Sequence, residues 1–163
     1  MQVNKIYLGD CLELLKDVPA KSIDMILCDL PYGTTACKWD AVIPFEPLWQ
    51  QYERVIKDNG AVVLTSAEPF TSFLITSNIK LFKYDLIWQK TLPKGHLNAK
   101  KAFMRAHENV CVFYKKPPVY NPQMTTGHNR KIAKTVYNKT AETDSAYGTE
   151  KRNTFYDSSE RYP

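Results

Sequence analysis

Residues 22–33, SIDMILCDLPYG, decide the fold. Their apolar residues stand on consecutive positions, as in a parallel strand that is covered on both faces. This predicted strand ends at Asp29, and the chain then turns through Pro31 and a glycine, with Tyr32 between them. Leu30 precedes a proline and is therefore biased toward an extended conformation, while Pro31 has no N–H to donate. We expect a stiff turn that offers only acceptors, the Asp29 carboxylate and the Leu30 carbonyl, beside an aromatic ring.

Such a corner suits a planar ligand that carries an amino group. Asp10, Asp29 and Ser66 each follow a predicted strand. Ligands of open α/β sheets gather at the carboxyl ends of the strands, so we expect all three side chains to line one rim.

Strands and helices alternate along the first part of the chain, which predicts an α/β fold with a mostly parallel sheet and helices on both faces. Asn59-Gly60 is read as the signal that ends the second helix. From Pro117 onward the periodicity fails. We therefore divide the chain into a folded region, 1–116, and a segment, 117–163, that is an irregular insertion or a target-recognition segment and is partly disordered. The expected strands lie at 5–8, 25–28, 61–65, 84–88 and 109–114, and the expected helices at 11–18, 45–56 and 69–75.

The composition is that of a globular protein, with 44% hydrophobic and 24% charged residues in 163. No apolar stretch approaches the roughly 20 residues that span a bilayer, and the N-terminus does not resemble a signal peptide. The four cysteines are scattered and form no metal-ligand pattern with histidine. We expect a cytoplasmic protein with reduced thiols, no membrane contact and no metal site.

Positive charge is concentrated in one segment. Residues 89–116 hold seven Lys or Arg against one acid, whereas residues 1–88 hold eight against eleven. The segment is either a solvated loop or, together with Phe103, a surface that faces phosphates. Its candidate DNA-binding residues are Lys90, Lys94, Lys100, Lys101 and Arg105.

The stretch Asp29-Leu-Pro-Tyr32 resembles the Asp-Pro-Pro-Tyr motif of the DNA amino-methyltransferases, which methylate adenine N6 or cytosine N4 with S-adenosylmethionine. Four further blocks follow the order of the permuted β group of this family, in which the catalytic half comes first. The resemblance covers roughly residues 3–116 and implies a Rossmann-like methyltransferase fold. The blocks are GDCLELL at 9–15, GAVVLTSAEPF at 60–70, YDLIWQK at 84–90 and RAHENVCVFYK at 105–115.

The resemblance also implies roles for single residues. Asp29 and the carbonyl of Leu30 accept the two N–H groups of the target amine, Pro31 stiffens the turn, and Tyr32 stacks on a base that has been flipped out of the duplex. Gly9, Asp10 and Asp29 are the implied cofactor-binding residues. For Asp10, capping of the following helix is a compatible alternative.

The chain departs from the family pattern at two places. Leucine stands at position 30, where the family usually has proline, and we expect slower chemistry from the lost ring. None of the six glycines forms a Gly-x-Gly pair, so the turn that holds the methionine part of the cofactor is missing. We expect a fold that is incomplete at its C-terminus, or a homodimer or second chain that completes the cofactor site.

We therefore predict a site-specific adenine-N6 methyltransferase that acts on double-stranded DNA, of the kind found in restriction-modification systems. Asp at position 29 favours adenine over cytosine. The alternatives are a cytosine-N4 enzyme, a methyltransferase for RNA or protein glutamine, and a non-catalytic DNA-binding remnant.

Overall fold

The structure, a computed structural model, describes residues 2–137 and 152–162. It forms two compact units, Met1–Val119 and Tyr120–Pro163. Among the described residues, no helix has the length and apolar character needed to cross a membrane.

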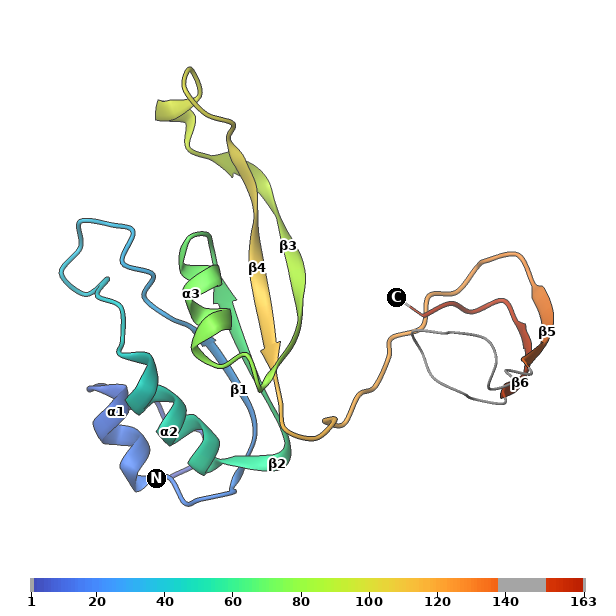
Figure 1. Cartoon of the computed structure of the whole chain (residues 1–163), viewed down its shortest axis with the longest axis horizontal. Coiled ribbons are helices and arrows are strands. Elements are labelled where there is room, and N and C mark those ends of the chain that lie inside the picture. The colour runs from blue at the N-terminus through green and yellow to red at the C-terminus, as the bar shows by residue number, and fades with distance from the viewer. Residues whose placement is uncertain (1, 138–151, 163) are drawn as a thin grey trace, which may run out of the picture. The chain divides into compact units, whose positions relative to one another are not determined.

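The first unit is built on a four-stranded sheet with the order β1-β2-β4-β3 (Figure 1). β1 (Ile23–Asp29) and β2 (Ile56–Ser66) are parallel. β4 (Arg105–Phe113) is antiparallel to both of its neighbours, β2 and β3 (Phe82–Lys94). The prediction of a mostly parallel sheet is therefore wrong for the described residues. The reason is that β3 and β4 are joined by a short hairpin connection, which can link only antiparallel strands.

Three helices cover one face of this sheet. α1 (Cys11–Leu14) continues as a 3₁₀ turn, η1 (Leu15–Asp17), and is followed by α2 (Phe45–Val55) and α3 (Phe70–Ser77). α2 shows the predicted amphipathic spacing and buries Leu48, Trp49, Tyr52 and Val55. The side chains that it meets on the sheet include Val62, Leu64 and Phe113. This apolar cluster is the core that fixes the carboxyl ends of β1 and β2.

The opposite face of the sheet is open in the described residues. We call the exposed apolar side chains on it the open face: Met25, Leu27, Tyr84, Leu86 and Trp88. The prediction of helices on both faces, made from the unbroken apolar run of β1, is thus not met by the part of the chain that the structure describes.

Two local predictions are wrong. Residues 5–8 form no strand, and Ile6 and Leu8 are fully exposed, because no neighbouring strand pairs with them in the described part of the unit. Asn59-Gly60 does not end α2 but lies inside β2, which begins at Ile56. Gly60 is needed for close packing instead, since a Cβ there would lie 2.8 Å from the carbonyl oxygen of Asp24.

β3 and β4 continue beyond the sheet as a two-stranded ribbon (Figure 1). β2 pairs with β4 only from Asn109 onward, so β4 residues 105–108 contact β3 alone. A turn that contains the short helix η2 (His96–Asn98) connects the two strands. We call residues 88–108 the ribbon.

The second unit contains an antiparallel pair, β5 (Lys131–Tyr137) and β6 (Arg152–Ser158). Arg130 donates two hydrogen bonds of 2.7 Å each to the carboxylate of Asp157 beside it. The prediction that 117–163 is irregular is therefore wrong for these strands. The two strands are defined by main-chain pairing between distant residues. Such pairing needs no apolar periodicity, so the sequence pattern did not predict it. Most of NKTAETDSAYGTEKRN, including Gly148, lies outside the described residues.

Candidate active site at the end of β1

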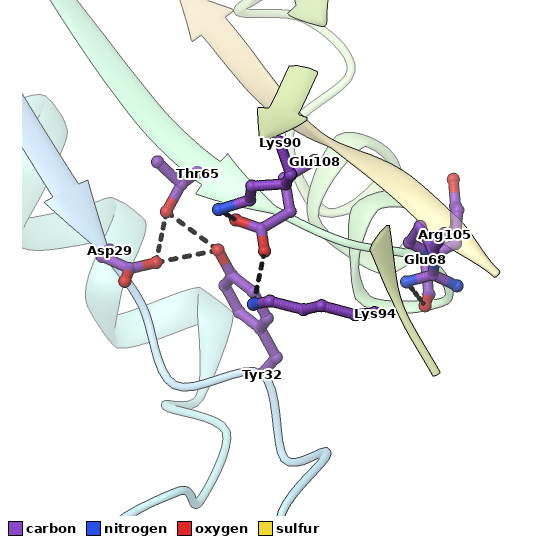
Figure 2. A network of polar contacts seen from close by, with 8 residues as sticks. All are labelled: Asp29, Tyr32, Thr65, Glu68, Lys90, Lys94, Arg105 and Glu108. Atoms are coloured by element: carbon purple, nitrogen blue, oxygen red, sulfur yellow. Dashed lines mark hydrogen bonds and ion pairs between the residues drawn. The ribbon is translucent and has the colours of Figure 1, made fainter. Parts of the chain in front are cut away.

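A cluster of three oxygen-bearing side chains lies where β1 and β2 end (Figure 2). Asp29 is the last residue of β1, and Thr65 is its register partner on β2. Oδ1 of Asp29 accepts hydrogen bonds from the hydroxyls of Tyr32, at 2.8 Å, and Thr65. The Tyr32 and Thr65 oxygens lie 2.9 Å apart. No hydrogen bond to the other carboxylate oxygen, Oδ2, occurs within the described residues, so Oδ2 is held in place and left available as an acceptor.

Tyr32 serves this cluster as a donor. Its ring stacks on Phe70, with a centroid distance of 5.1 Å and an interplanar angle of 25°. Burial raises the pKa of Tyr32 and outweighs the opposite influence of the Thr65 hydrogen bond, and the hydrogen bond to Asp29 adds a smaller upward contribution. The phenol therefore stays protonated at neutral pH and fixes the Asp29 carboxylate.

The corner is stiffened by packing as well as by proline. Leu30, which stands where the family usually has proline, is only 5% exposed. Its side chain belongs to the same apolar cluster as Leu64 and Phe70. Burial of the leucine therefore anchors the Leu30 carbonyl and offsets part of the rigidity that a proline ring would add.

Asp40, which sequence reasoning missed, holds the loop that follows the corner. Its carboxylate accepts hydrogen bonds from the main-chain N–H groups of Gly33, Thr34 and Thr35 at 2.9, 2.9 and 2.7 Å. Hydrogen bonds from Thr35 and Gly33 keep the pKa of Asp40 below its usual value. Gly33 has a φ of +68°, which favours glycine. The sequence gives no signal for this role, because only the folded loop brings the Asp40 carboxylate to the main-chain N–H groups that it binds.

A pocket of about 380 Å³ opens beside Tyr32, between the corner and the ribbon. We call it the ribbon pocket. The carboxylate of Glu108 lies inside it and pairs with Lys90 at 2.8 Å and with Lys94 at 3.1 Å. Burial raises the pKa of Glu108, but the hydrogen bonds from the two lysines outweigh it and the net shift is downward. Figure 2 shows this ion-paired group next to Tyr32.

The remaining predicted site residues on the N-terminal side are placed as follows. Asp10 caps α1, because its side chain accepts the N–H of Leu12 at 2.8 Å, and Gly9 precedes it. A cofactor role for these two residues stays a prediction. Ser66 does not line the rim: it is fully buried and bonds to Thr71 on the helix side. Alternation along β2 turns Thr65, not Ser66, toward Asp29.

The predicted DNA-binding residues occupy different environments. Lys100 and Lys101 are exposed in the connection between the two ribbon strands. Arg105 donates to the carbonyl oxygen of Glu68 at 3.0 Å. Lys94 is largely exposed, whereas the Lys90 side chain is 18% exposed. No group of three or more metal-ligating side chains occurs among the described residues.

Comparison with known proteins gives DNA methyltransferases. No protein-family model matches the chain. The Type II methyltransferase M1.MboII of Moraxella bovis is 25% identical over 127 residues, covering 71% of this chain and 47% of the relative. M.BglII of Bacillus subtilis is 29% identical over 133 residues, covering 71% and 36%, and M.HinfI of Haemophilus influenzae is 28% identical over 134 residues, covering 66% and 37%. The chain thus spans between about a third and a half of these relatives.

Solved structures agree in fold. The cytosine-N4-specific PvuII DNA methyltransferase superposes with a TM-score of 0.52 at 19% identity, over 69% of this chain and 49% of its own. M1.HpyAVI superposes with a TM-score of 0.50 at 20% identity, over 68% and 55%. The Rossmann-like methyltransferase fold is therefore confirmed, and so is the resemblance of the sequence to the DNA amino-methyltransferases.

Proposed function

We propose that this chain supplies the amine-binding part of a DNA amino-methyltransferase active site, in a reaction that moves a methyl group to adenine N6. One observation carries the proposal: the Asp29 carboxylate stands at the end of β1 with Oδ1 fixed by Tyr32 and Thr65 and with Oδ2 free of hydrogen bonds from the described residues. The Leu30 carbonyl is the second acceptor.

Two acceptors are the chemistry that the substrate needs. The exocyclic amine of adenine is a poor nucleophile, because its lone pair is delocalised into the ring. When the Asp29 carboxylate and the Leu30 carbonyl each accept one N–H, the nitrogen becomes more tetrahedral and its lone pair is released. The carboxylate also stabilises the positive charge that develops on nitrogen. S-adenosylmethionine, when bound, supplies an electrophilic methyl group.

Adenine is the proposed base because the first motif position is aspartate. Cytosine N4 is the second candidate, since the PvuII enzyme, which has the same fold, is cytosine-N4-specific by name. DNA methylated by this chain together with the segment that completes the cofactor site is digested to nucleosides and examined by mass spectrometry. We expect N6-methyladenine; a dominant N4-methylcytosine signal would replace the proposed base and leave the acceptor chemistry unchanged.

Double-stranded DNA is the proposed partner, approached by the ribbon. Phe103 is fully exposed there, and Lys100 and Lys101 lie beside it in the sequence. Cations and an exposed aromatic ring are suited to phosphates and unstacked bases. The named relatives are bacterial proteins, and the cytoplasm is therefore the proposed location of the enzyme.

The cofactor site is proposed to need a further polypeptide segment. The chain has no Gly-x-Gly turn, which this fold uses to bring main chain close to a bound nucleotide. A second copy of the chain lacks the turn equally, so a homodimer does not supply it. The open face of the sheet gives such a segment an apolar surface to cover.

Calorimetry with S-adenosylmethionine tests this requirement. We expect weak or undetectable binding to the 163-residue chain, because half a site bears the ordering cost of association with few contacts. Micromolar binding by the chain alone would place the whole cofactor site within it. Absence of binding and of methyl transfer even after the turn is supplied would favour the non-catalytic alternative.

A further inference from the structure

The ribbon pocket contains a lysine, Lys90, whose position is set by two neighbouring side chains. Trp88 and Lys90 are two residues apart on β3 and so lie on the same face, and Glu108 is the register partner of Trp88 on β4. The Lys90 ammonium lies 2.8 Å from the Glu108 carboxylate and 3.6 Å from the centre of the Trp88 ring. Both members of the ion pair are shielded, with side-chain exposures of 18% for Lys90 and 13% for Glu108.

This arrangement keeps hydrogen-bond donors in the pocket. An ammonium group has three N–H donors; Glu108 takes one and the Trp88 ring faces another side, so donor capacity is left toward the pocket that Lys90 and Tyr32 both line. Glu108 also binds Lys94. Two lysines and one carboxylate leave the group with a net positive charge.

Stability alone does not account for a shielded ion pair at this place. Taking both charges out of water costs free energy that their attraction recovers only in part, and apolar residues of similar size often serve a fold as well. The position of the pair, beside the Asp29–Tyr32 corner, is what needs an explanation.

Lys90 is a donor in the pocket, and Asp29 is an acceptor just beyond it, hydrogen-bonded to the Tyr32 hydroxyl. Adenine and cytosine match this pair, since each carries its exocyclic amine next to an unprotonated ring nitrogen, N1 or N3. Guanine and thymine present the reverse, an exocyclic oxygen next to a ring N–H. A base with the reversed pattern would face Lys90 with a donor and Asp29 with an acceptor.

We propose that Lys90, held by Glu108 and Trp88, donates a hydrogen bond to the ring nitrogen next to the target amine and thereby determines which bases the pocket admits. The inference rests on the proposed function, because it assigns the base that Asp29 binds. Lys94 lines the same pocket but is 72% exposed, so we assign Lys94 to the phosphates together with Lys100 and Lys101, and Lys90 alone to the base.

Short fluorescein-labelled oligothymidines that bind the full chain test this proposal by anisotropy. The central position carries adenine, 1-deazaadenine, which keeps the amine but lacks N1, or thymine. We expect adenine to bind at least about tenfold more tightly than 1-deazaadenine, as for a hydrogen bond to a charged group. Lys90→Met should remove this difference.

Lys94→Met is the matched control, because Lys94 is also a lysine that pairs with Glu108 but is 72% exposed. It should weaken binding of all three oligonucleotides alike and keep the preference for adenine. Lys90→Met should fold, since Glu108 retains Lys94 as a partner, and circular dichroism checks this. Glu108→Gln, which releases Lys90 without removing it, should also reduce the preference.

Two results would overturn the inference. The first contradicts only the role of Lys90, and the second also contradicts the proposed function. Equal affinity of the wild-type chain for adenine and 1-deazaadenine, with a preference for adenine over thymine that Asp29→Ala abolishes, would remove the role of Lys90 and leave the proposed function standing. No preference for adenine over thymine would contradict both.

Discussion

Replacing Asp29 by alanine separates a catalytic role from a structural one. The carboxylate accepts two hydroxyl hydrogen bonds, from Tyr32 and Thr65, and each contributes about 1 kcal/mol net. After the change, Tyr32 still has Thr65 as a partner at 2.9 Å, and no donor is left buried and unpaired. The loss of stability is therefore about 2 kcal/mol at most.

The expected loss of rate is larger. Removing one of two positioned acceptors costs on the order of 10²–10³ in rate, or about 3–4 kcal/mol of transition-state stabilisation. A domain with at least about 5 kcal/mol of stability stays more than about 99% folded after losing 2 kcal/mol. Unfolding therefore cannot produce the predicted fall in activity.

The assay follows tritiated methyl incorporation into DNA by the gene product, together with the segment that completes the cofactor site, and thermal unfolding of each variant. Asp24→Ala is the control, because Asp24 lies on the same strand with its side chain 81% exposed and paired with Lys57 at 2.7 Å. It should leave the rate unchanged. Methyl transfer by Asp29→Ala within about tenfold of the wild type would refute the catalytic assignment.

Three further predictions concern the ribbon, the Asp40 loop and the cofactor site. Replacing Lys100 and Lys101 by glutamine should weaken DNA binding equally for all sequences and reduce the magnitude of the slope of log K against log salt by about 2. An unchanged slope would show that the two lysines do not contact phosphates and belong to a solvated loop. Because the pKa of Asp40 is lowered in the fold, its stabilisation is complete above its ordinary pKa and is lost as the pH falls through the lowered one. Asp40→Asn should therefore flatten the loss of stability below about pH 4 in denaturant titrations, and an unaltered acid limb would contradict this. The purified chain alone should transfer no methyl group; turnover without a partner would mean that the cofactor site does not need the glycine turn.

Local features of this chain could be predicted from its sequence. The amphipathic spacing of α2 and the end of β1 at Asp29 follow from neighbouring residues, because helix periodicity and proline restrict the chain over a few positions. The family motif then identified the corner. The motif does not decide whether the basic segment 89–116 is a solvated loop or a surface that faces phosphates.

Features that depend on pairing between distant strands could not be predicted. The apolar run before Ser66 predicts a place for it on the rim, yet β2 includes Ser66, and a shift of one residue turns a side chain to the opposite face. Thr65 faces Asp29 only because the two are register partners. Likewise, the parallel sheet expected from alternating elements failed at β4, whose direction is set by its hairpin with β3.

Strand pairing also determines the surroundings of the charged side chains in the ribbon. In sequence, Lys90 is one of seven cations in the basic segment 89–116, and nothing local distinguishes it from Lys94. The antiparallel register brings Glu108 opposite Trp88, so the only acid of residues 89–116 meets the lysine two residues further along β3. Lys94 also pairs with Glu108 and lines the ribbon pocket, but only Lys90 is largely shielded and lies over the Trp88 ring. Net charge therefore predicts a surface suited to a nucleic acid, while strand register decides which cation lies beside the Asp29–Tyr32 corner.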